Sequence, residues 1–168
     1  MLTADCMVTN QRGEILLVRR GNDPYKDCWA LPGGFMEMDE TTNHCAVREL
    51  EEETGLVVSE QDIRLIGVYS APGRDPRGRT VTAAYRVVLG TRSSTLTPFG
   101  SPSPSLGEEP RKLNSCSPKL GELAVQNGLT EECIKAGDDA AEVRWWPLDK
   151  LPPLAFDHAQ IVSDGQRL

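Results

Sequence analysis

The chain has 168 residues, enough for one domain with a hydrophobic core, and its formal net charge is -7, with 25 acidic against 18 basic residues. This charge argues against non-specific binding to nucleic acid or to an anionic membrane surface. No apolar stretch approaches the length that a bilayer-spanning helix needs, so we expect no membrane partner.

The cysteines and the first residues bear on the compartment. The five cysteines are scattered and include no Cys-x-x-Cys pair, which argues against a zinc site and against a disulfide framework. The N-terminal residues show neither the basic region nor the apolar core of a secretory signal. Reduced thiols are therefore the expected state, and we expect an intracellular, cytoplasmic protein.

The first predicted elements are two strands, over residues 4–8 and 14–19, joined by a hairpin turn at residues 10–13. The second strand contains the continuous apolar run 15–18, which suits a strand that is buried on both faces. A short extended segment over residues 29–34 follows and ends in a glycine turn.

A helix is predicted next, with Asp39 as its N-cap and Gly55 just past its end. Its apolar stripe, Ala46, Val47 and Leu50, would face a sheet. The acidic side chains of the same helix would then point away from the sheet, into a cleft.

Three further strands are predicted over residues 63–69, 80–89 and 141–146, with a terminal helix over residues 157–168. Residues 91–121 interrupt this order, because they are rich in Ser and Pro and show no hydrophobic period. We therefore predict one domain over residues 1–168, with a disordered insertion at 91–121.

The most informative feature is a cluster of acidic side chains on the first helix. Glu49 and Glu53 are four residues apart and Glu52 is three residues after Glu49, so the three carboxylates are neighbours on the helix surface. Carboxylates at this spacing repel one another unless a cation neutralises them, and their oxygens suit a hard divalent ion such as Mg²⁺. The simpler alternative is a solvated acidic face, which is the commoner case for a Glu-rich helix.

The run from Gly34 to Leu56 resembles the Nudix box, G-x5-E-x7-R-E-U-x-E-E-x-G-U, in which U is an aliphatic residue. The nine specified places are filled without a gap by Gly34, Glu40, Arg48, Glu49, Leu50, Glu52, Glu53, Gly55 and Leu56. A chance match of this length is on the order of one in ten million. The resemblance implies an α/β protein with the Nudix fold, a mixed β-sheet sandwiched between α-helices.

The resemblance also implies an activity: hydrolysis of a nucleoside diphosphate linked to another moiety, with Mg²⁺ or Mn²⁺ as the cofactor. Glu49, Glu52 and Glu53 would be metal ligands, and the backbone carbonyl of Gly33 would be a further ligand. This assignment agrees with physical chemistry, because an acidic site can bind a pyrophosphate only through bridging cations.

The identity of the catalytic base is left open by the sequence. Glu52 or Glu49 could activate a water molecule directly, whereas Asp139 is a candidate on the loop before the last strand. Asp is also favoured in turns for structural reasons alone. Arg48 would orient a carboxylate in the site, with Glu40 as its partner.

The loop of residues 74–79 gives the best indication of the substrate. Arg74, Arg77 and Arg79 present forked donors that suit phosphate or ribose oxygens, although a solvated hairpin is the simpler interpretation. Similarity to ADP-ribose pyrophosphatases extends over residues 72–81, 83–85, 136–140, Trp145 and 156–158. The expected reaction is the hydrolysis of ADP-ribose to AMP and ribose 5-phosphate.

Three aromatic residues, Trp29, Tyr69 and Tyr85, are candidates for stacking on adenine, with Trp29 taken as a substrate-binding residue. Each is of a type that more often belongs to a core. The expected partner is a small-molecule nucleotide, and a homodimer is compatible with the resemblance, because many relatives dimerise.

Two alternative functions are compatible with the same residues. The first is a Nudix pyrophosphatase that acts on oxidised nucleoside triphosphates or on dinucleotides such as NADH. The second belongs to another class, a non-catalytic regulator or scaffold that senses ADP-ribose. Such regulators tend to lose carboxylates of the box, whereas every one is present here.

Substitution Glu52→Gln tests the assignment of the box carboxylates. The neutral amide cannot replace a carboxylate as a metal ligand or as a base, so we expect the substitution to abolish hydrolysis. Release of AMP from ADP-ribose in the presence of Mg²⁺ is the measurement. Unchanged turnover would contradict the role given to Glu52.

Overall fold

The computed structural model describes residues 1–90 and 140–168. The predicted insertion at 91–121 and the base candidate Asp139 lie outside these residues. The strands are β1 (Leu2–Thr9), β2 (Glu14–Arg20), β3 (Trp29–Ala30), β4 (Gly33–Phe35), β5 (Arg64–Tyr69), β6 (Val81–Val88) and β7 (Ala140–Pro147). The helices are α1 (Thr42–Thr54) and α3 (His158–Gly165).

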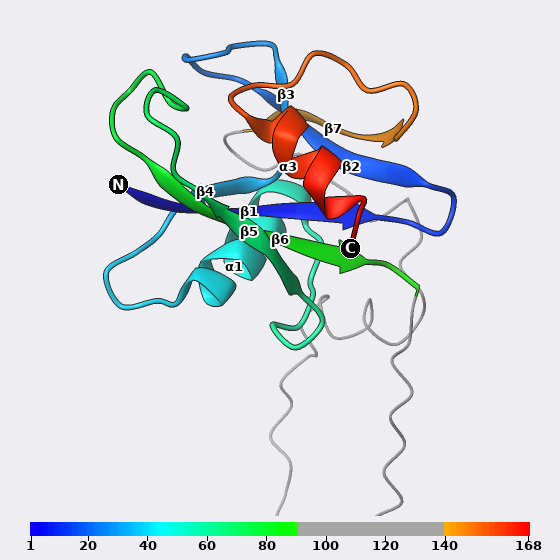
Figure 1. Cartoon of the computed structure of the whole chain (residues 1–168). Helices are drawn as coiled ribbons and strands as arrows, with labels where there is room; N and C mark the ends of the chain where they lie inside the picture. Colours follow the sequence, from blue (N-terminus) through cyan, green and yellow to red (C-terminus); the bar gives the residue numbers. More distant parts are fainter. Residues whose placement is uncertain (91–139) are drawn as a thin grey trace, which may run out of the picture.

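The strands form one mixed sheet in the order β3-β2-β1-β6-β5, in which β4 also pairs with β1 and β7 with β2. β1 and β6 run parallel, whereas the other strand pairs are antiparallel. Figure 1 shows α1 on one side of this sheet and α3 on the other. The predicted fold class, a mixed sheet between helices, is confirmed.

Alternate residues of the central strands supply two separate cores. Cys6 and Val8 of β1 pack with the buried residues of α1, whereas Met7 between them packs with Ile161 of α3. β2 behaves in the same way, since Leu16 faces α1 and Leu17 faces α3. The continuous apolar run in β2 therefore reflects burial on both faces, as predicted.

The N-cap of helix α1 lies two residues later than predicted. The Oγ1 of Thr41 accepts a hydrogen bond from the backbone N–H of His44 at 3.2 Å, so Thr41 is the N-cap and the prediction of Asp39 was wrong. The helix ends at Gly55, which has φ of 72° and donates its N–H to the Glu51 carbonyl, as predicted. Buried Cys45, Ala46 and Leu50 fix this helix on the sheet.

Helix α3 is shorter than predicted, since it ends at Gly165. Asp157 stands at its N-cap position, but its carboxylate makes no capping hydrogen bond. Both carboxylate oxygens instead accept from Arg74, at 2.6 and 2.8 Å. This ion pair connects the start of α3 to the loop between β5 and β6.

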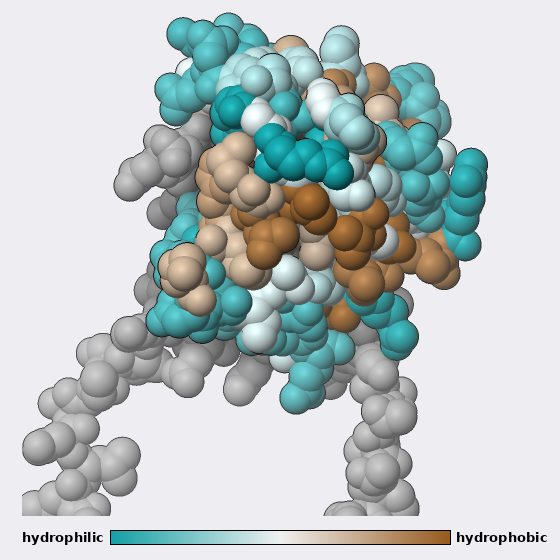
Figure 2. All heavy atoms as spheres, turned by 60° about the vertical axis from the view of Figure 1, so that its left-hand side comes forward, coloured by the Kyte–Doolittle hydropathy of each residue, from teal (hydrophilic) through white to brown (hydrophobic). Residues whose placement is uncertain are grey.

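The surface also bears on the predicted partners. Figure 2 shows apolar side chains gathered in one zone of the face turned forward, with hydrophilic ones around it. Exposed large apolar residues include Met1, Leu2, and, on the edge strand β5, Leu65 and Val68. This surface is compatible with a homodimer, which stays a prediction. No helix within residues 1–90 and 140–168 is both long enough and apolar enough to span a bilayer.

His158, the first residue of α3, is buried, with 4% of its surface exposed. Its Nδ1 accepts the backbone N–H of Leu31 at 2.9 Å, so the neutral ring carries its proton on Nε2, which lies 3.8 Å from Oδ1 of Asp5. Burial lowers the pKa of His158 below its ordinary value of 6.5. The imidazole is therefore a neutral connection between β3–β4 and α3.

This burial predicts a pH-dependent stability. Below pH 6.5 the unfolded chain binds a proton at His158 that the folded chain does not, so stability falls as pH falls. Between pH 7.5 and pH 5, we expect the free energy of unfolding of the wild type to fall by up to about 2 kcal/mol more than that of His158→Gln. Urea unfolding at the two pH values measures the difference.

The explanation is wrong if His158→Gln keeps the pH dependence of the wild type.

Candidate active site

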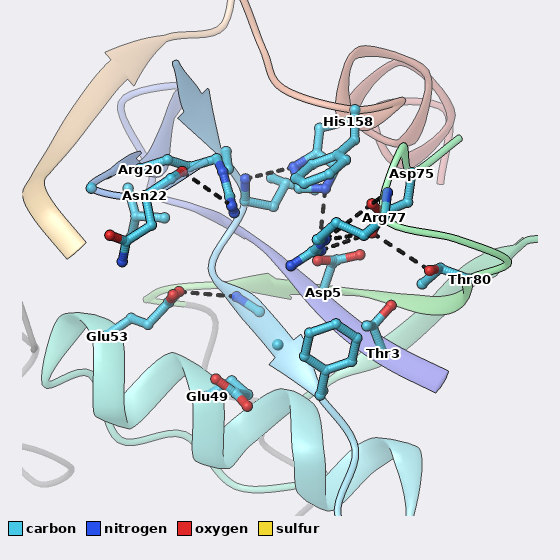
Figure 3. A pocket seen from close by; sticks show the side chains of 18 of the residues that line it. Thr3, Asp5, Arg20, Asn22, Glu49, Glu53, Asp75, Arg77, Thr80 and His158 are labelled. Atoms are coloured by element: carbon cyan, nitrogen blue, oxygen red, sulfur yellow. Dashed lines mark hydrogen bonds and ion pairs between the residues drawn. The ribbon is translucent and has the colours of Figure 1, made fainter. Parts of the chain in front are cut away.

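A pocket of about 400 Å³ lies between α1, β4, the loop after β2, the loop before β6 and the start of α3. Figure 3 shows its side chains converging from these separate elements. Glu49 and Glu53 of α1 form one side, and Arg20 and Arg77 belong to the other. The pocket therefore has an acidic wall on α1 and, opposite it, a wall with Arg20 and Arg77 (the basic wall), to which Asp5 and Asp75 also belong.

The acidic wall consists of two carboxylates that are partly removed from water. Burial raises the pKa of Glu53 to about 8, although the backbone N–H of Gly33 donates to its Oε2 at 3.0 Å and opposes the shift. Burial also raises the pKa of Glu49, in spite of its contact with Arg48. Ionised carboxylates in such surroundings are favoured by a neighbouring cation.

Glu52 does not join this wall. Its side chain is 60% exposed and its Oε2 accepts from Nη1 of Arg48 at 3.1 Å, and Glu52 is absent from the pocket lining. The structure thus brings together two of the three carboxylates that the helical spacing grouped. In the part of the chain that the structure describes, no three His, Cys, Asp or Glu side chains form a ready-made metal site.

The donor set nevertheless suits a hard divalent ion. Glu49 and Glu53 offer oxygens only, and the backbone of Gly33 lies in the same pocket. Burial deprives the carboxylates of Glu49 and Glu53 of stabilisation by water. A bound cation would restore that stabilisation, so burial favours cation binding. The residues present therefore fit Mg²⁺ or Mn²⁺.

The glycine pair of β4 lets these groups approach. A Cβ at Gly34 would collide with the carboxylate of Glu49. A Cβ at Gly33 would lie 2.6 Å from Oδ1 of Asp5 and would collide with the Ala4 carbonyl oxygen. A larger residue at Gly33 would have to displace the backbone of β1, whereas one at Gly34 would push the Glu49 carboxylate out of its position.

Arg48 holds the acidic side chains in place. Its guanidinium donates to both oxygens of Glu40, at 2.7 and 3.0 Å, and to Oε1 of Glu49 at 2.9 Å. It also donates to the Phe35 carbonyl at 3.2 Å. The hydrogen bonds from Arg48 keep the pKa of Glu40 well below its usual range. Arg48 contacts Glu40 and Glu49 in the way expected of a residue that orients carboxylates.

The three arginines of the predicted substrate loop have different surroundings. Arg74 lines the pocket, but its side chain is only 4% exposed and is neutralised by Asp157. Arg77 lines the pocket and forms a forked ion pair with Asp75, with a closest distance of 2.7 Å. Arg79 donates to the Ser70 carbonyl at 2.6 Å and lies outside the pocket lining.

The structure places Trp29, the residue predicted to stack on adenine, outside the pocket lining. Trp29 is 9% exposed and packs edge-on against Trp146 at 5.2 Å, in the core beneath α3. The hydroxyl of Tyr69 donates to Asp164, and that of Tyr85 donates to Asn43. None of these rings lines the pocket, because each completes a core or a helix contact.

The aromatic residues that do line the pocket are Phe35 and Phe156. Sequence reasoning singled out neither as a site residue, and it also missed Arg20. Phe35 directly follows the glycine pair, and Arg20 ends a buried strand, which are signals that could have been used. Phe156 belongs to the similar segment 156–158, but no local pattern indicates its φ of 54°, an uncommon conformation for a bulky residue.

Comparison with known proteins agrees with this geometry. A model of the NUDIX domain matches residues 1–105. An ADP-ribose pyrophosphatase from Methanocaldococcus jannaschii is 37% identical over 161 residues, which are 95% of this chain and 70% of that protein. The ADPR responsive transcriptional repressor NtrR from Acinetobacter baylyi is 38% identical over 78 residues, 45% of this chain and 30% of the repressor.

Among solved structures, a bifunctional NMN adenylyltransferase/ADP ribose pyrophosphatase from Francisella tularensis, complexed with AMP and Mn ion, is similar with a TM-score of 0.65 and 28% identity. The match covers 99% of this chain but 41% of that protein. The matches therefore cover less than half of the repressor and of the bifunctional enzyme. With the box complete and the family model matched over residues 1–105, the chain belongs to the NUDIX domain family.

Proposed function

We propose that this protein hydrolyses ADP-ribose to AMP and ribose 5-phosphate with a divalent metal ion. The observation that carries the proposal is the two-sided pocket, with Glu49 and Glu53 facing Arg77 across a space of about 400 Å³. The 37% identity to an ADP-ribose pyrophosphatase, over 95% of this chain, supports this choice of substrate.

The proposed reaction adds water across the diphosphate. One P–O bond of the P–O–P bridge breaks and a bond from phosphorus to the water oxygen forms, which leaves one phosphate on each product. A bound Mg²⁺ or Mn²⁺ would polarise a phosphoryl oxygen and lower the pKa of water. Glu49, Glu53 and the Gly33 carbonyl would hold the ion, with Glu52 as a further ligand from the exposed side of α1.

The roles proposed for Arg48, for Arg77 and for the catalytic base follow from where these residues lie. Arg48 would keep Glu49 oriented, while the guanidinium of Arg77, fixed by Asp75, would bind phosphate oxygens. The base that takes the proton of the water is Glu49 or Glu52 on α1, or Asp139. Of the first two, Glu49 lines the pocket.

A second candidate function is a sensor of ADP-ribose. It is favoured by the similarity of 45% of this chain to the repressor from Acinetobacter baylyi. Both functions use the same pocket, and they differ in whether the bound nucleotide is cleaved. The complete set of box carboxylates favours the enzyme. The use of Mg²⁺ or Mn²⁺ in particular stays a prediction, as do a cytoplasmic location and a homodimer.

A substrate panel tests the proposal. Purified protein with Mg²⁺ or Mn²⁺ is incubated with ADP-ribose, NADH, a diadenosine polyphosphate and an oxidised deoxyguanosine triphosphate. We expect ADP-ribose to give the highest kcat/KM, with AMP and ribose 5-phosphate as products, because the relative that is 37% identical over 95% of this chain is an ADP-ribose pyrophosphatase. Chromatography of the products measures each reaction. Preference for another member of the panel would refute the substrate, and binding of ADP-ribose without cleavage would support the sensor.

A matched pair of variants on α1 supplies the control. Glu53→Gln removes a carboxylate of the pocket and should lower kcat by at least about 100-fold, the scale of losing one charged group from an electrostatic site. Glu51→Gln changes an exposed carboxylate of the same helix and should leave kcat unchanged. Equal activity of the two variants would contradict the proposed site.

A further inference from the structure

Arg20 is a pocket residue that belongs neither to the box nor to the arginine loop. It ends β2 and lines the pocket on the side away from α1 (Figure 3). Its Nε donates to the Pro24 carbonyl at 2.8 Å, and Nη2 lies 3.5 Å from the Asn22 carbonyl. The loop after β2 therefore fixes the direction of the guanidinium.

The charge of Arg20 is not neutralised in the way that its neighbours are. Arg74 and Arg77 form ion pairs with Asp157 and Asp75. Arg20 has only carbonyl oxygens as hydrogen-bond acceptors, and within residues 1–90 and 140–168 no carboxylate lies within 4.0 Å of its guanidinium. A half-buried guanidinium with this environment can still accept an anion.

Phe156 places the two pocket arginines together. The guanidinium carbon of Arg20 lies 5.0 Å from the centre of this ring, and that of Arg77 lies 5.5 Å from it. Burial and the charge of Arg77 lower the pKa of Arg20, whereas the charges of Glu53 and Asp75 oppose this shift, so Arg20 and Arg77 repel each other in the pocket. An anion that contacted both would remove that repulsion.

The opposite wall explains why a phosphate needs these cations. Glu49 and Glu53 repel a diphosphate from the α1 side in the absence of a metal ion, so a substrate requires donors on the far side. Guanidinium groups suit this task because they bind phosphate oxygens through two parallel hydrogen bonds.

We infer that Arg20 is a substrate-binding residue, which together with Arg77 holds a phosphate of the substrate against the basic wall, opposite Glu49 and Glu53. The inference rests on the proposed function for the identity of the substrate, but the chemistry that it requires is that of a diphosphate. Phe156 acts as a positioning residue for both guanidinium groups.

The test uses binding, so that it does not depend on turnover. Isothermal titration calorimetry with Mg²⁺ present measures the dissociation constants of inorganic pyrophosphate and of ADP-ribose, the latter in proteins that also carry Glu52→Gln so that ADP-ribose is not cleaved during the titration. Compared with the wild type, Arg20→Gln should weaken both by about 10-fold or more, because a hydrogen bond between charged groups is lost. Arg20→Lys, which keeps the charge but not the fork, should be intermediate. Thermal melting of each variant within a few degrees of the wild type excludes unfolding as the cause.

Arg64→Gln is the control, because Arg64 lies exposed on the edge strand β5 and outside the pocket lining. It should bind both anions as the wild type does. The inference is overturned if Arg20→Gln binds both anions as tightly as the wild type, or if the wild type binds neither.

The outcomes separate this inference from the proposed function. Binding of pyrophosphate that depends on Arg20, in a protein that does not cleave ADP-ribose, would support the basic wall and refute the activity. Cleavage of ADP-ribose together with unchanged binding by Arg20→Gln would support the proposed activity and refute the role inferred for Arg20.

Discussion

A single guanidinium, that of Arg48, allows the acidic helix to face a partly buried pocket. It contacts the carboxylates of Glu40, Glu49 and Glu52 and the backbone carbonyl of Phe35. Like charges so close on a helix would otherwise destabilise it. Because Arg48 compensates Glu49 and Glu52 of the helix, and Glu40 before it, Glu53 can lie deeper, where a backbone N–H is its hydrogen-bond partner.

The basic wall is assembled from parts of the chain that are far apart in sequence. Arg74 is tied to Asp157 and Leu31 to His158, so α3 fixes both the arginine loop and the segment before the glycine pair. Phe156 directly precedes Asp157 and His158, and it therefore lies beside Arg20 and Arg77. The pocket therefore depends on α3 as much as on α1, although only α1 carries the recognisable motif.

Part of the fold and of the pocket was predictable from the sequence, and individual residues show why. Helix α1, its end at Gly55 and the two-sided burial of β2 follow from local periodicity, and all three agree with the structure. The convergence of carboxylates was predicted only in part, because helical spacing does not reveal that Arg48, four residues before Glu52, holds that side chain outward. The position of Trp29 depends on its contact with Trp146, and that of Arg20 on its contact with Phe156. Both contacts join residues far apart in the sequence, so no local pattern contains them.

The two ties to α3 have a consequence for how relatives of this protein should be judged. A homologue can keep every letter of the box and still lack partners equivalent to Asp157 and His158. Its acidic helix would fold on the sheet, but two of the contacts that hold the opposite wall in place would be missing. Pairwise retention of positions 74 with 157, and of an acceptor at 158, is therefore a better criterion for an intact pocket than the signature alone.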